Sequence, residues 1–81
     1  PTGWVAHRMR PLSVEDLRED PRFAGRYDRP TRGEVTSFLG VPLRSGSEVV
    51  GVLEVYSRKR RAWRNEETRL LLSFASQAAV A

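Results

Sequence analysis

Residues 36–57 read TSFLGVPLRSGSEVVGVLEVYS, and this stretch decides the fold. Two runs rich in valine, leucine and aromatic residues flank a polar segment at 44–47, which predicts two long strands joined by a tight turn. We place Ser45 and Gly46 at the centre of that turn. In this register both faces of the hairpin are largely apolar, so each face must be covered. The stretch therefore predicts a sheet packed against helices on two sides, with a ligand as a further candidate.

The predicted register also defines a candidate site. It places Ser37 opposite Glu54 among apolar residues of one face, and Gly40 opposite Gly51 on the other face. The Glu54 carboxylate is then either solvated near the strand end or directed into a polar pocket, where an arginine of residues 22–32 could neutralise it. Facing glycines let another backbone approach, and we favour close helix packing as their role.

The flanking sequence supplies helices and an irregular loop. Residues 1–9 predict a short amphipathic helix and residues 11–14 a short strand. Prolines and glycines break up residues 20–34, where Phe23 and Tyr27 are the large apolar anchors. Asn65 is the expected N-cap of a helix that runs to the end of the sequence. Its small residues would allow a second helix to approach closely.

The composition excludes several kinds of site. The 81 residues make one domain, and the absence of cysteine excludes disulfides, thiolate metal sites and cysteine nucleophiles. With a single histidine, the sequence offers few ligands for a zinc site and only one candidate base for a Ser-His-Asp arrangement. No apolar run approaches about 18 residues and no signal peptide is recognisable, so we expect a cytoplasmic domain without membrane insertion. We predict no catalytic residues and no metal site.

The net charge of +4 raises the question of nucleic-acid binding. The basic residues are scattered along the chain, however, and acidic residues accompany many of them. The run at 58–61 has too few neighbouring aromatic residues for a base-stacking platform. We therefore interpret the arginines as a solvated surface and expect no nucleic-acid partner.

Several stretches, in this order and spacing, resemble a GAF domain, a sensory module of signalling proteins. The likeness covers almost the whole chain and is carried by residues 3–6, 11–16, 20–23, 37–43, 49–53 and 63–81. It implies an α+β fold with an antiparallel sheet flanked by helices (GAF/PAS-like). It also implies that the first helix and first two strands of the family precede Pro1, with the first strand beside residues 49–56. Residues 1–81 are thus predicted to be a partial sensor domain, incomplete at its N-terminus.

Domains of this family usually bind small molecules or chromophores, or dimerise, and pass a signal through their terminal helices. Of the positions comparable to the cyclic-nucleotide motif of the family, 58, 59, 63, 67 and 68, only Lys59 matches. The bilin-attaching and methionine-sulfoxide-reducing branches need cysteines, which this sequence lacks. The resemblance therefore implies a regulatory domain rather than an enzyme. Its parent would be a bacterial signalling protein such as a two-component histidine kinase, a diguanylate cyclase or a transcription activator.

We expect an unidentified small-molecule ligand between the hairpin and residues 11–33, a homodimer formed through the C-terminal helix, and an output domain on the same polypeptide. No cofactor is assigned. The candidate pocket residues are Trp4, Phe23, Tyr27, Ser37, Leu39, Val52, Glu54 and Tyr56, and the candidate dimer-helix residues are Leu71, Phe74, Ala75 and Ala78. Two alternatives stay open: a ligand-free structural dimerisation module, and a small basic nucleic-acid-binding domain.

Overall fold

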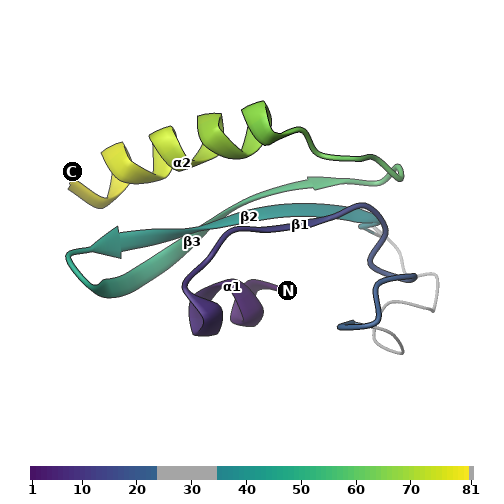
Figure 1. Ribbon diagram of the computed structural model, residues 1–81, viewed down its shortest axis with the longest axis horizontal. Helices are drawn as coiled ribbons and strands as arrows, with labels where there is room; N and C mark the ends of the chain where they lie inside the picture. Colours follow the sequence, from purple (N-terminus) through teal and green to yellow (C-terminus); the bar gives the residue numbers. More distant parts are fainter. Residues whose placement is uncertain (24–34, 81) are drawn as a thin grey trace.

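The computed structural model describes residues 1–23 and 35–80, which form a three-stranded sheet with a helix on each face (Figure 1). The elements, in chain order, are α1 (Thr2–Arg8), β1 (Leu12–Val14), β2 (Ser37–Ser45), β3 (Glu48–Ser57) and α2 (Asn65–Val80). The sheet is antiparallel, with β2 between β1 and β3. The predicted α+β fold, an antiparallel sheet flanked by helices, is confirmed. Tyr27 lies outside the described residues.

The hairpin is confirmed, but its turn lies one residue later than predicted. Ser45 pairs with Glu48, so Gly46 and Ser47 are the central residues. Gly46 has a φ of 61°, whereas the φ of Ser47 is not positive. A glycine at the first central position of a two-residue turn suits type II′, whose twist matches that of the flanking strands.

The predicted strand register is wrong, and a β-bulge explains why. The pairing shifts between Leu43 and Arg44, because Arg44 pairs with Val49 while Leu43 pairs with Gly51. Val50 is therefore the extra residue of β3. Beyond the bulge Gly40 faces Glu54 rather than Gly51. Because one inserted residue moves all following side chains to the opposite face, the bulge exchanges the two faces of β3 relative to the prediction.

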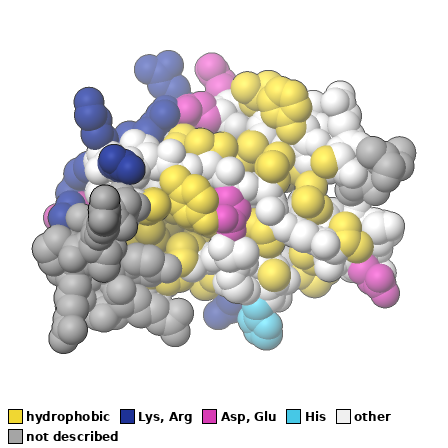
Figure 2. All heavy atoms as spheres, turned by 180° about the vertical axis from the view of Figure 1, so that it is seen from behind, with side chains coloured by type: hydrophobic (Ala, Val, Ile, Leu, Met, Phe, Trp, Pro, Cys, Tyr) yellow, Lys and Arg dark blue, Asp and Glu magenta, His cyan; other side chains and the backbone are white. Residues whose placement is uncertain are grey.

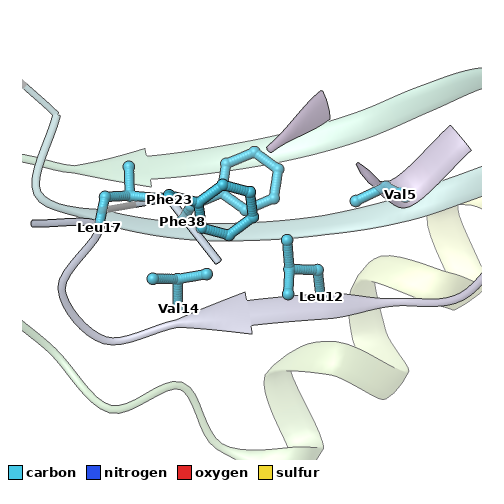
Figure 3. Close-up of a cluster of buried hydrophobic side chains, with 6 residues drawn as sticks. All are labelled: Val5, Leu12, Val14, Leu17, Phe23 and Phe38. Carbon is cyan, nitrogen blue, oxygen red and sulfur yellow. The ribbon is translucent and has the colours of Figure 1, made fainter. Parts of the chain in front are cut away.

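Two hydrophobic cores lie on opposite faces of the sheet. The α1-side core gathers between α1, the sheet and the segment after β1, and Figure 3 shows its six buried side chains: Val5, Leu12, Val14, Leu17, Phe23 and Phe38. The α2-side core is built by Leu39 and Val41 of β2 with Leu71 and Ala75 of α2. The need to cover both faces, expected from the apolar hairpin, is thus met by a helix on each side.

Helix α2 begins one residue earlier than a cap at Asn65 would allow. The Arg64 carbonyl accepts a hydrogen bond from the Thr68 amide (3.2 Å), which makes Arg64 the N-cap. The Glu67 carboxylate accepts a hydrogen bond from the Arg64 amide (2.9 Å). A glutamate three residues into the helix satisfies the cap amide in the same way in a capping box. This bond, followed by the Arg61 guanidinium, holds the pKa of the Glu67 carboxyl below its ordinary value.

Candidate functional site

The predicted pocket residues divide between the two faces of the sheet. Trp4 and Val52 pack against the α1-side core, and Phe23 belongs to it. Glu54 shares this face of β3 with Val52 and Tyr56, because residues two apart in a strand point to the same side. Ser37 and Leu39 lie on the α2 side instead. Ser37 is fully buried, and its hydroxyl donates a hydrogen bond to the Lys59 carbonyl (3.0 Å). The structure therefore separates Ser37 from Glu54, which the predicted register paired.

Glu54 is a half-buried carboxylate held by two hydroxyl groups on the α1 side. The Thr2 hydroxyl donates to Oε1, and the Tyr56 hydroxyl donates to Oε2. Tyr56 in turn packs edge-on against the Phe38 ring, with centroids 5.5 Å apart. These partners come from α1 and β3. Of the arginines predicted to neutralise Glu54, Arg22 pairs with Asp20 instead, and the others lie outside the described residues. The arrangement places a hydrogen-bonding acidic group beside aromatic and aliphatic side chains at the margin of the sheet.

An arginine lies between two aromatic rings on the same side of the molecule. The Arg22 guanidinium carbon is 5.4 Å from the centroid of Trp4 and 5.7 Å from that of Phe23. The Asp20 carboxylate accepts hydrogen bonds from Arg22 Nε (2.9 Å) and Nη2 (2.6 Å). This pairing lowers the pKa of Asp20 and raises that of Arg22. The Asp20 carboxylate pairs the charge of Arg22 and holds its guanidinium in place. Arg22 therefore attaches the segment after β1 to α1 through its contact with the Trp4 ring.

A groove lies between α2 and the edge strand β3, on the face away from α1. It encloses about 250 Å³. Its walls are mainly apolar, with an ion pair between Arg61 and Glu67 among them. The lining residues are Leu39, Val55, Arg61, Trp63, Glu67, Leu70, Leu71 and Phe74. Figure 2, which views the molecule from the β3 side, shows hydrophobic side chains spread over this surface and basic side chains gathered at one end.

The four predicted dimer-helix residues fall on two sides of α2. Leu71 and Ala75 are buried against the sheet, with 9% and 2% of their surface exposed. Ala78 is exposed, and Phe74 exposes 55% of its surface. Leu70, one turn before Phe74, exposes 60%. Of the four predicted dimer-helix residues, Phe74 and Ala78 are therefore the exposed ones. Leu70 adds a further exposed apolar side chain one turn before Phe74.

Acidic and basic residues meet where β3 leads into α2. Arg60 Nε is 3.3 Å from Glu15 Oε1, and Arg60 Nη1 is 2.5 Å from Glu19 Oε2. These carboxylates raise the pKa of Arg60. Together with Asp16 and Asp20 they line a small cavity of about 180 Å³. Within residues 1–23 and 35–80, no group of three or more histidine, cysteine or acidic residues has the arrangement of a metal site.

The family model for the GAF domain matches residues 1–81. The chain belongs to the GAF domain family. It is 35% identical over 79 residues to a Nif-specific regulatory protein of Herbaspirillum seropedicae, a match that covers 93% of this chain and 15% of that protein.

Solved structures show the same fold. The GAF domain of an Acinetobacter phosphoenolpyruvate-protein phosphotransferase superposes with a TM-score of 0.80 at 24% identity, covering 99% of this chain and 44% of that one. A type II free methionine-R-sulfoxide reductase from Thermoplasma acidophilum gives 0.79 at 20% identity, covering 98% and 52%. Residues 1–81 thus span about half of these chains and a small part of the regulatory protein. No helix among the described residues is long and apolar enough to cross a membrane.

The sequence did not reveal some of the residues that organise these surfaces. Thr2 and Arg60 were not singled out, although one binds Glu54 and the other joins two carboxylates. Their partners lie more than 40 positions away in sequence, so no local pattern marks them. The one sequence signal of this pairing is the opposite charge of the acidic residues within 15–20 and the basic run at 58–61.

Proposed function

We propose that this GAF domain is a regulatory sensing and dimerisation module of a cytoplasmic signalling protein. A small molecule would bind on the α1 side of the sheet, and its presence would change the packing of α2. Through α2 the domain would pair with a second copy and act on an output domain of the same polypeptide. The likeness to a Nif-specific regulatory protein supports a regulatory role rather than a catalytic one.

The observation that carries this proposal is the two-sided character of α2. One side, with Leu71 and Ala75, closes the core of the sheet. The other side presents Leu70 and Phe74, more than half exposed, next to an apolar groove. Neighbouring large apolar side chains exposed on one helix face are typical of an interaction surface. A helix in this position would link the sheet to a partner directly.

The α1 side offers the chemistry for a ligand. Glu54 and Tyr56 provide hydrogen-bonding groups, and Trp4 and Val52 provide apolar contacts. Apolar side chains combined with a few polar groups are typical of the residues that bind small molecules. A ligand carrying a hydrogen-bond donor would fit beside Glu54 by replacing the Thr2 hydroxyl.

We also propose that a further strand of the same polypeptide, preceding Pro1, pairs with β3. The outer edge of β3 carries the exposed Val50, Val55 and Tyr56 and has no strand beside it among the described residues. An exposed apolar edge favours pairing with another strand. Thr2 contacts Glu54 of β3, so a preceding segment would enter beside this edge.

Native mass spectrometry of the intact polypeptide tests the function. We expect a dimer that retains a small-molecule mass, and we expect Glu54→Gln to lose that mass while remaining dimeric. A dimer without added mass would favour the ligand-free structural module. A monomer without added mass would contradict both parts of the proposal.

A further inference from the structure

Residues 14–23, from the last residue of β1 onward, contact both α1 and the residues that lead into α2, although the two helices lie on opposite faces of the sheet. At its far end it is attached to α1: Arg22 lies over the Trp4 ring, and Phe23 is buried in the α1-side core. In the middle, Leu17 is buried in that core as well, and its amide donates to the Thr36 carbonyl (2.8 Å). The segment is therefore fixed to the α1 side at more than one point.

The near end of the same segment is attached to the approach to α2. The Trp63 indole Nε1 donates a hydrogen bond to the Val14 carbonyl (3.2 Å). The Arg61 amide donates to the Glu15 carbonyl (3.4 Å). Arg60 pairs with both Glu15 and Glu19. Contacts from Arg60, Arg61 and Trp63 thus join residues 58–64, which are neither helix nor strand, to residues 14–19.

Within the segment, hydrogen bonds make the two ends one unit. The amides of Glu19 and Asp20 donate to the Asp16 carbonyl (3.2 and 3.1 Å), and the Phe23 amide donates to the Asp20 carbonyl (3.0 Å). The Asp16 carboxylate accepts hydrogen bonds from the Arg18 amide (2.9 Å) and guanidinium. A displacement of Arg22 would therefore be transmitted to Glu19 through a small number of hydrogen bonds within the segment.

We propose that residues 14–23 form a strut that couples the α1 side to the first turn of α2, with Arg60 as its coupling residue. The element with two states is the first turn of α2, which opens and closes locally. With the strut in place, Arg60 and Trp63 hold the residues that precede this turn. When the α1 end of the strut is released, these contacts weaken and the turn opens more often. The strut deepens the proposed function, because it supplies a route from the ligand side to α2.

Amide hydrogen exchange on the intact polypeptide tests the strut without any ligand. Arg22→Gln weakens the attachment at the α1 end by removing the contact with Trp4, and Arg60→Gln removes the ion pairs at the α2 end. We expect Arg22→Gln to raise exchange at residues 68–71 by about two- to fivefold, the range expected from partly exposed ion pairs. In the Arg60→Gln background the same substitution is expected to add less than about 1.5-fold, because coupled residues are not additive.

Arg58→Gln is the matched control. Arg58 lies two positions before Arg60, is exposed, and makes no ion pair with any described residue. In its background the effect of Arg22→Gln is expected to keep its full size. Glu19→Gln, which removes one carboxylate partner and leaves Arg60 in place, is expected to give an intermediate effect and provides a second, milder variant.

Two results would overturn the strut: unchanged exchange at residues 68–71 in Arg22→Gln, or effects of Arg22→Gln and Arg60→Gln that multiply independently. Neither depends on whether a ligand or a dimer exists. Failure of the native mass experiment would remove the proposed function and leave the exchange result standing, so the two proposals fail separately.

Discussion

Gly40 is the residue at which β2 has no room for a side chain. A Cβ there would lie 2.5 Å from Cζ of Phe38 and 3.2 Å from Cγ2 of Val5. We expect Gly40→Ala to lower the free energy of unfolding by about 1–3 kcal/mol, because the Phe38 ring and α1 must both move. Gly3→Ala is the control, since a Cβ at Gly3 meets nothing within 4 Å and alanine favours α1. Urea unfolding compares them, and equal stabilities would contradict the close packing of α1 on β2.

Asp16 and Asp20 make the stability of the fold dependent on pH. Side-chain hydrogen bonds from Arg18 and Arg22, respectively, hold the pKa of each carboxyl below its ordinary value of 3.8. Because a lowered folded-state pKa favours the ionised form, this stabilisation is present above about pH 4 and is lost as the pH falls through the folded-state values. We expect the melting temperature to fall as the pH drops below about 4, and to fall less in Asp20→Asn. An identical pH dependence in the variant would assign the acid sensitivity to other carboxylates.

At the scale of the elements, the hairpin depends on its turn. Gly46 has a positive φ of 61°, a conformation that costs an L-residue about 1–2 kcal/mol. We expect Gly46→Ala to lower the free energy of unfolding by about 1 kcal/mol, while Ser47→Ala stays within about 0.5 kcal/mol of the wild type. Denaturant unfolding followed by circular dichroism measures both. A larger loss in Ser47→Ala would contradict the assignment of Gly46 to the first turn position.

The hairpin could be predicted from sequence, but its register could not. Alternation of apolar and polar residues normally fixes the register of a strand pair. Here both faces are apolar, so a shift by one residue leaves the pattern unchanged. The bulged residue, Val50, is a valine beside another valine and carries no sequence mark. The predicted pairing of Ser37 with Glu54 depended on the register and is wrong for that reason.

The helices were predicted more accurately than the strand register, because local sequence patterns mark where a helix begins. The start of α2 was predicted to within one residue, since an asparagine followed by two glutamates marks a helix start. The side of α2 that faces the sheet was not predicted: Leu71 and Ala75, expected at the dimer surface together with Phe74, are buried against the sheet, while Phe74 is exposed. The helix is apolar around much of its circumference, so periodicity alone did not separate its core side from its outer side.

The whole molecule has three surfaces to which we assign different roles. The α1 side carries Glu54 and the proposed ligand contacts. The edge of β3 is the proposed pairing site of a further strand, and the outer side of α2, with Leu70 and Phe74, is the proposed contact with a second copy. The strut at residues 14–23 would connect the first surface to the third. Of these, the outer side of α2 is the one on which the proposed signal depends.

Sedimentation equilibrium of the intact polypeptide, wild type against Phe74→Glu, tests this surface most directly. Ser73→Glu is the matched control, because Ser73 is exposed on the same helix and does not line the groove between α2 and β3. We predict a dimeric wild type, an at least tenfold higher dimer dissociation constant (about 1.4 kcal/mol) for Phe74→Glu, and no comparable change for Ser73→Glu. A monomeric wild type, or equal dissociation constants for the wild type and Phe74→Glu, would contradict the account.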